Sequence, residues 1–96
     1  LAKPLTFAVK PKETSVPVSD KKVSFTIMPA PQSATVIFNG QEIPLTKNGL
    51  QWEAMLSSAT EGKHQLTVMP FRGKPVQIEI EIYGMGFSSA LSDFEL

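Results

Sequence analysis

The chain has 96 residues, of which 42% are apolar, and its nine basic side chains balance its nine acidic ones. This length and composition predict one globular domain with a two-layer core, and the zero net charge argues against a surface for nucleic acid or an anionic membrane. The absence of cysteine excludes disulfides, thiolate metal sites and a cysteine nucleophile, and no run of 18 apolar residues is present that would predict a membrane-spanning segment.

Alternation of apolar and polar residues predicts strands along most of the chain. Residues 5–9 form a first, short strand that we expect at a sheet edge, because a proline flanks it on each side and proline cannot donate a ladder hydrogen bond. Residues 11–20 are polar and interrupted by proline, and we interpret them as a loop or as a strand that switches between sheets. Residues 22–27 alternate again and predict a half-buried strand that ends at the following Met-Pro pair.

Turn signals then separate short alternating segments. Asn39-Gly40 joins residues 35–38 to residues 41–45 in a predicted type I′ hairpin, since Asn and Gly both tolerate positive φ. Pro44 places the second arm of this hairpin at a sheet edge. Asn48-Gly49 makes the next turn, after which we expect alternate residues of a strand over 50–56 to point into the core, beginning with Leu50.

The last two predicted strands, residues 65–69 and 76–83, form a hairpin around Arg72-Gly73. In the final strand the isoleucines point inward and the glutamates point outward. A slip of one residue would bury both glutamates without partners, so the register of this strand is strongly fixed.

The predicted sandwich domain covers residues 1–84, and residues 85–96 are a C-terminal extension or linker. In this extension Phe87, Leu91 and Phe94 fall at helical spacing (i, i+4, i+7) and form a possible anchor for binding a partner. A docked chain end, or the linker to a further domain, is the alternative interpretation and the one that chain ends favour.

The expected core consists of the inward-facing apolar residues of all these strands. They are Phe7, Val23, Phe25, Ile27, Val36, Phe38, Leu50, Trp52, Leu56, Leu66, Val68, Ile78, Ile80 and Ile82. This pattern predicts an all-β fold, an antiparallel β-sandwich of about seven strands with a short C-terminal extension.

Three segments carry a resemblance to a known family: Val36 to Gly40 (V-x-x-N-G), Gly49 to Leu56 (G-x-W-x-x-x-L) and Glu61 to Val68 (E-G-x-H-x-L-x-V). Together they resemble bacterial immunoglobulin-like accessory domains of the E-set type, found in secreted and surface proteins. The resemblance implies an immunoglobulin-like sandwich that serves as a non-catalytic spacer, adhesion or scaffold module of a larger protein. Its partners would be neighbouring domains or another protein, contacted through loops, edge strands or the tail.

An extracytoplasmic location (periplasmic, secreted or cell-surface) is expected for such a module. The chain begins at Leu1, which we interpret as a processed or excised piece of a longer protein. Secreted bacterial β-domains often lack cysteine, although a cytosolic domain is equally consistent with its absence.

A second resemblance, to starch- and glycogen-binding modules of the same sandwich type, rests on Phe38-Asn39-Gly40, on Gly49 to Trp52 and on Glu61 to His64. It implies glycan binding through exposed aromatic rings, with Trp52, Phe71 and Tyr83 as candidates. Those modules carry a stacking tryptophan shortly after the Phe-Asn pair, where this chain has Gln41-Glu42-Ile43.

The remaining chemical candidates have simpler structural explanations. His64, the only histidine, points inward at the start of its strand and is expected to bond a loop carbonyl. Trp52 shares its face with aliphatic residues, so core packing is favoured over sugar stacking. Glu79 and Glu81 lie about 7 Å apart on one face, as in glycosidase or calcium sites, but a solvated strand face is favoured. We therefore expect no enzyme activity, metal or cofactor.

Overall fold

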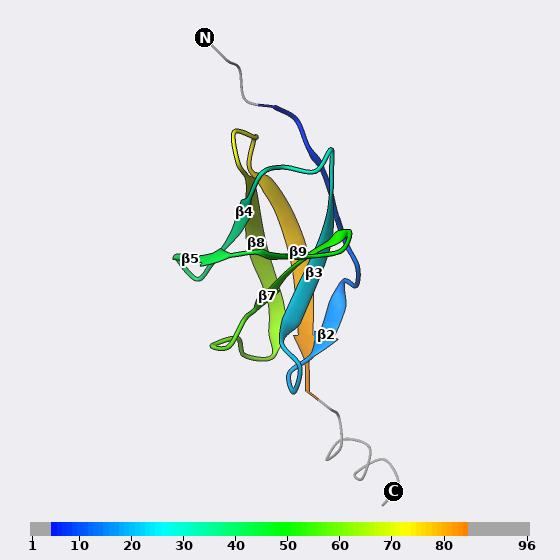
Figure 1. Ribbon diagram of the computed structural model, residues 1–96. Coiled ribbons are helices and arrows are strands. Elements are labelled where there is room, and N and C mark those ends of the chain that lie inside the picture. The colour runs from blue at the N-terminus through cyan, green and yellow to red at the C-terminus, as the bar shows by residue number, and fades with distance from the viewer. Residues whose placement is uncertain (1–4, 85–96) are drawn as a thin grey trace, which may run out of the picture.

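The computed structural model describes residues 5–84, which form an all-β structure (Figure 1). This part of the chain contains nine strands and no helix. The strands are β1 (Ala8–Pro11), β2 (Ser15–Pro17), β3 (Lys22–Met28), β4 (Ala34–Phe38), β5 (Gln41–Pro44), β6 (Thr46–Asn48), β7 (Gln51–Met55), β8 (Gly62–Pro70) and β9 (Val76–Tyr83).

The strands form two sheets. One sheet has four strands in the order β1-β3-β7-β6, and the other has five in the order β2-β9-β8-β4-β5. In Figure 1, β3 and β7 of the first sheet lie in front of β8 and β9 of the second. Neighbouring strands are antiparallel except for β2, which runs parallel to β9. The fold is therefore all-β and sandwich-like, but the predicted purely antiparallel pairing is wrong at this one edge.

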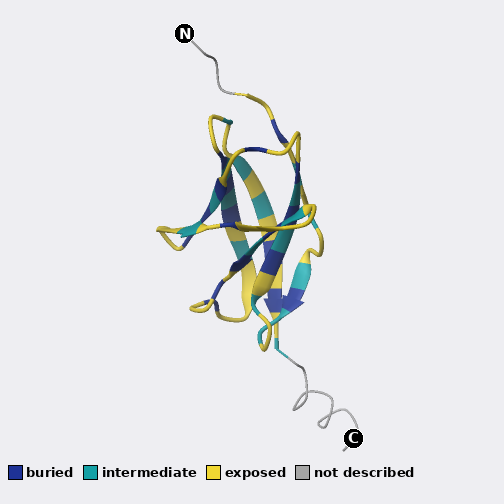
Figure 2. Ribbon diagram, viewed as in Figure 1, coloured by how far each residue is buried: buried dark blue, intermediate teal, exposed yellow. Residues whose placement is uncertain are grey.

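A single hydrophobic core lies between the sheets (Figure 2). Its most deeply buried members come from both layers. Phe25 of β3 is fully buried, and so are Val36, Leu66 and Ile80 of the five-stranded sheet. Among residues 5–84 no polar or charged residue is buried. Each fully buried apolar side chain contributes roughly 1.5–3 kcal/mol, so this interface between the sheets dominates the stability of the fold.

Most of the predicted pattern is confirmed. The Asn39-Gly40 turn has φ of 52° and 76° and joins the directly opposed residues Phe38 and Gln41, as a type I′ hairpin requires. Strand β9 buries Ile80 and Ile82 and exposes both glutamates, while Ile78 is only partly buried. The core residues absent from the predicted list are Val16, Ala34, Leu45, Ala54 and Ala59.

Leu50 is the clear error in the predicted core, because its side chain is 82% exposed. Asn48 pairs with Gln51, so Gly49 and Leu50 form a two-residue turn between β6 and β7. Gly49 has φ of 64°, the conformation that a type II′ turn needs at its first central position. The inward pattern therefore starts at Trp52 and not at Leu50.

The count of about seven strands is also too low, because two short strands lie where the chain changes sheets. Strands β1 and β2 are adjacent in sequence but belong to different sheets, so residues 11–20 contain a strand that switches sheets, one of the two predicted alternatives. Strands β5 and β6 switch in the same way around the buried Leu45, whose N–H donates to Ala34 O at 2.9 Å. On both lateral sides, the chain thus passes directly from the edge strand of one sheet to the edge strand of the other.

The four edge strands offer few free backbone donors. Alternate residues of an edge strand point their N–H groups away from the sheet. The hydrogen bond from Lys12 N–H to Ser24 O leaves Val9 and Pro11 as the outward residues of β1. The bond from Leu45 N–H to Ala34 O likewise leaves Glu42 and Pro44 as the outward residues of β5. In each strand proline removes one of the two outward donors.

The other two edges follow the same rule. Val18 N–H donates to Tyr83 O, which leaves Ser15 and Pro17 as the outward residues of β2. In β6 the outward residue is Lys47, opposite Trp52. Prolines and charged residues at outward positions oppose pairing with a further strand, so the lateral edges are poor sites for strand addition.

The described chain enters and leaves the sandwich at opposite ends. Leu5 N–H donates to Arg72 O at 2.9 Å, and Phe71 N–H donates to Ser33 O at 2.8 Å, so residues 5–7, 28–33 and 71–75 meet at one end, which we call the hairpin end. Residues 18–21, 57–62 and 81–84 meet at the other, which we call the Gly84 end. The two ends are separated by the length of β9, about 23 Å.

Candidate functional site

A shallow groove of about 280 Å³ lies at the hairpin end of the five-stranded sheet. It is formed where the β8–β9 hairpin meets the start of β4 and the edge strand β5. Its lining residues are Ser33, Ala34, Thr35, Glu42, Met69, Pro70, Phe71, Arg72 and Gly73. The groove therefore combines apolar walls with one basic and one acidic side chain, which suits a peptide segment better than a small polar substrate.

Phe71 and Arg72 give this groove its chemistry. The Phe71 side chain is 45% exposed, and the Arg72 guanidinium lies 5.2 Å from the centroid of its ring, within cation–π range. On the β5 side, Glu42 Oε2 accepts a hydrogen bond from Thr35 Oγ1 at 3.0 Å. The positive charge thus lies beside the exposed ring, and the negative charge is held at the far rim.

The groove is shaped by a tight contact beneath it. The ring of Phe7 packs so closely against Gly73 that a Cβ atom at this position would lie 2.5 Å from Phe7 Cδ2. Phe7 is buried, so the ring has little room to move away. Glycine at position 73 is therefore required for the β8–β9 hairpin to close over the core.

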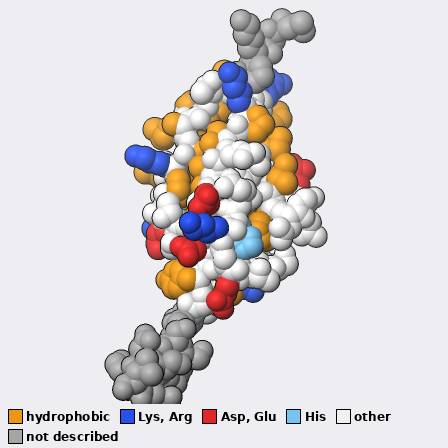
Figure 3. Space-filling view, turned by 180° about the vertical axis from the view of Figure 1, so that it is seen from behind, with side chains coloured by type: hydrophobic (Ala, Val, Ile, Leu, Met, Phe, Trp, Pro, Cys, Tyr) orange, Lys and Arg blue, Asp and Glu red, His pale blue; other side chains and the backbone are white. Residues whose placement is uncertain are grey.

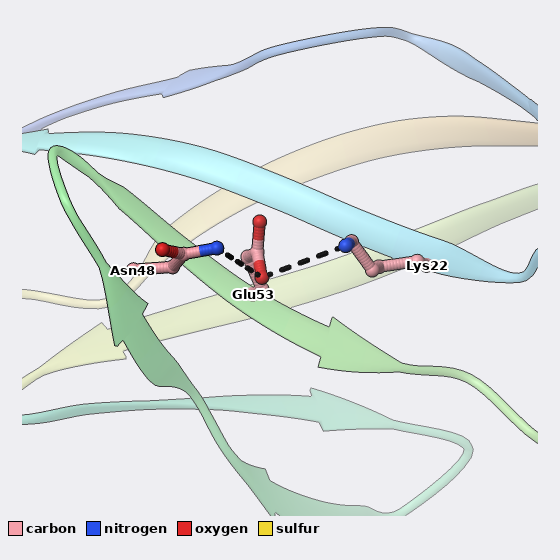
Figure 4. A network of polar contacts seen from close by, with 3 residues as sticks. All are labelled: Lys22, Asn48 and Glu53. Carbon is pink, nitrogen blue, oxygen red and sulfur yellow. Dashed lines mark hydrogen bonds and ion pairs between the residues drawn. The ribbon is translucent and has the colours of Figure 1, made fainter.

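A small polar network covers the outer face of the four-stranded sheet (Figure 4). Glu53 Oε1 accepts a hydrogen bond from Asn48 Nδ2 at 3.4 Å and lies 3.6 Å from Lys22 Nζ. The three side chains come from β7, β6 and β3, which are neighbours in the sheet. A single carboxylate held by a lysine and an amide has the composition of a surface ion pair, and it lacks the second acid or the nucleophile that hydrolysis would need.

His64 lies where the sequence placed it. Its Nε2 is 2.7 Å from Thr60 O, and because a carbonyl oxygen only accepts, Nε2 carries the proton. The ring also packs edge-on against Phe38, with centroids 5.2 Å apart. The predicted bond to a loop carbonyl is confirmed, and this arrangement ties the β7–β8 loop to the core.

Glu79 and Glu81 are exposed on the outer face of β9. Glu79 accepts a hydrogen bond from Gln65 Nε2 at 3.2 Å and lies 4.0 Å from Lys63 Nζ. These contacts run along an exposed strand face, as expected from the alternation of the sequence. Within residues 5–84 no group of three or more acidic or histidine side chains is placed to hold a metal ion.

The three aromatic residues considered for glycan binding do not form a row. Trp52 is 4% exposed within the core, with Lys47 Nζ 5.8 Å from its ring centroid, so it presents no free face. Phe71 lies at the hairpin end, whereas Tyr83, 44% exposed, lies at the Gly84 end. The two exposed rings are thus separated by the whole of β9, too far apart to stack on successive sugars.

The tail residues proposed as a partner anchor, Phe87, Leu91 and Phe94, lie outside the described residues, and the anchor stays a prediction. No model of a known protein family matches the chain, and no curated protein matches its sequence. Within residues 5–84 no helix has the length and hydropathy needed to cross a bilayer.

The groove cannot be identified from the sequence alone, because its walls come from three separated segments of the chain. Residues 33–35, 42 and 69–73 meet only after β4 pairs with β5 on one side and β8 on the other. The sequence identifies Phe71 as an aromatic candidate, but its neighbours across the sheet depend on the strand register.

Proposed function

We propose that this chain is an immunoglobulin-like module of a larger extracytoplasmic protein, with a non-catalytic spacer, adhesion or scaffold role. The strand order supports the immunoglobulin-like assignment. In that fold seven strands, A to G in chain order, form sheets ABED and CFG. Taking β1, β3, β4, β6, β7, β8 and β9 as A to G reproduces both orders, with β2 and β5 added at the edges of the second sheet.

The observation that carries the proposed role is the placement of the ends. The described chain enters at the hairpin end and leaves at the Gly84 end, as an in-line spacer requires (Figure 1). Two of the polar side chains stabilise the fold, since His64 bonds the carbonyl of Thr60 in a loop and Glu79 accepts a hydrogen bond from Gln65 of the neighbouring strand. The proline-bearing edges oppose lateral pairing, which favours contacts through the ends over contacts through the edge strands.

Titration with soluble glucans tests this proposal against the carbohydrate-binding alternative. We expect no saturable heat signal with glycogen or linear maltooligosaccharides, because the exposed rings Phe71 and Tyr83 are at opposite ends. Saturable binding that is lost on changing Phe71→Ala or Tyr83→Ala would favour the alternative. The surface change Leu50→Ala is a matched control, since this side chain is also exposed but belongs to neither the hairpin end nor the Gly84 end.

A second experiment tests the tail as a partner anchor. Changing Phe87, Leu91 and Phe94 together to serine should leave the free energy of unfolding within about 0.5 kcal/mol, because residues 5–84 already complete a core without them. The same variant should lose whatever partner the full chain binds. A large loss of stability would instead indicate that the tail packs on its own sandwich.

A further inference from the structure

Charge is distributed along the long axis of the sandwich. The segments of the hairpin end, residues 5–7, 28–33 and 71–75, contain Arg72 and Lys74 and no acidic residue. The segments of the Gly84 end, residues 18–21, 57–62 and 81–84, contain three acidic residues and one lysine. Figure 3 shows basic side chains at the top of the rear face and acidic side chains mainly in its lower half, where basic side chains also lie among them. The two ends therefore carry opposite charge.

The sequence of residues 85–96 complements the hairpin end. This segment contains Asp93 and Glu95 and no basic residue, and these acids alternate with Phe94. The groove at the hairpin end offers Arg72 beside the exposed ring of Phe71, with Met69 and Pro70 as further apolar walls. Glu42 lies at the opposite, β5 rim, where Thr35 donates to it, so an acidic segment with large apolar side chains matches the Arg72 and Phe71 side of the groove in charge and hydrophobicity.

A chain cannot place its own three anchor residues in its own groove. Phe87 follows Gly84 by three residues, which span about 11 Å when fully extended, so Phe87 cannot reach the groove of its own chain, whereas Phe94, ten residues after Gly84, can span about 33 Å. The groove begins beyond Val76, on the far side of β9 from Gly84, about 23 Å away. Only a second copy can therefore place all three anchor residues at the hairpin end, because its tail can approach from outside.

We infer that the groove at the hairpin end binds residues 85–96 of a second copy of this chain, so that copies associate head to tail. This inference names the partner of the proposed interaction module and rests on that proposed function. The contact is heterologous, with different surfaces on the two copies, and it leaves a free groove at one end and a free tail at the other. Such contacts build open rows, in solution or between successive modules of one polypeptide.

Sedimentation velocity of the full chain, from micromolar to millimolar concentration, tests this inference. We expect association that grows with concentration and weakens as salt is raised. A hairpin-end variant, Arg72→Glu in the groove with Lys74→Glu next to it, and a tail variant, Asp93→Lys with Glu95→Lys, should each lower the association constant about tenfold or more. Mixing the two variants should restore association, because each then meets an oppositely charged surface on the other.

A matched control separates local contact from net charge. Lys12→Glu with Lys63→Glu changes the net charge as much as the hairpin-end variant does, but both lysines lie outside the groove and outside the segments of the hairpin end. This control should keep the association constant within about twofold of the unchanged chain. A chain that stays monomeric throughout, variants with no effect beyond the control, or a mixture that fails to restore association would each overturn the inference. Those outcomes leave the spacer role standing, whereas glucan binding would remove the proposed function itself.

Discussion

Strands β9 and β5 belong to the same sheet, yet they contribute to the molecule in different ways. Strand β9 has eight residues, is bonded on both sides and fully buries Ile80 and Ile82. Strand β5 has four residues, is bonded on one side, and only Ile43 among them is partly buried. Centre strands thus supply most of the stability of the fold, and edge strands determine whether the folded chain pairs with a further strand.

The largest effect is expected at the centre of the other sheet. Changing Trp52→Ala should lower the free energy of unfolding by about 3–5 kcal/mol, because the side chain is nearly fully buried on the inner strand β7. Urea unfolding followed by circular dichroism measures this loss. Trp52→Phe, which keeps a ring in the same place, should cost clearly less. Equal stability of the alanine variant would mean that the centre does not carry the fold.

The next effect is expected where the centre meets the hairpin end. Gly73→Ala should destabilise the fold by about 1–3 kcal/mol, since the added methyl group would overlap the ring of Phe7. Combining it with Phe7→Leu should cost less than the sum of the two single changes, because the smaller side chain makes room. Thermal unfolding of the three variants measures this coupling, and strict additivity would show that the two residues do not touch.

A smaller effect on stability, but a change in association, is expected at the edge. Pro44→Thr should alter the free energy of unfolding by less than about 1 kcal/mol, because the position is exposed on an edge strand. It would, however, add a second outward N–H donor beside that of Glu42 and so permit strand addition. Light scattering should then detect dimers or aggregates. Gln41→Thr is the control, since residue 41 is bonded to Phe38 within its hairpin. If both variants associate to the same extent, Pro44 does not protect this edge from strand addition.

The smallest effect is expected at Leu50. Changing Leu50→Ser should leave the free energy of unfolding within about 0.5 kcal/mol, because the side chain projects from the β6–β7 turn into solvent. A loss of about 2–5 kcal/mol, measured by urea unfolding, would instead show that Leu50 packs in the core, as the alternation of the sequence predicts.

The long strands are predictable from the sequence, because alternation of apolar and polar residues is a strong signal when one face of a strand is buried. β9 and the Asn39-Gly40 hairpin followed directly from it. Leu50 was misplaced because the two-residue turn uses Gly49 as its first central residue and takes Leu50 as its second. Strands β2 and β6 have three residues each, too few for alternation to identify a strand, and β6 is exposed throughout.

The candidate site was less predictable than the fold. Val16 and Ala59 are buried although they lie among polar residues and prolines, because their environment is set by strands distant in sequence. The groove at the hairpin end depends in the same way on the pairing of β4 with β5 and β8. Local sequence determines which residues form strands, whereas the identity of a surface depends on which strands become neighbours.

Amide hydrogen exchange of the monomeric protein tests the contrast between centre and edge most directly. The amides of Leu66 and Ile80, bonded between β8 and β9, should exchange only on global unfolding. The outward amides of Val9, Glu42 and Lys47 should exchange almost as fast as in an unfolded chain. Strong protection at these three edge positions in dilute solution, or rapid exchange at Leu66 and Ile80, would contradict the account.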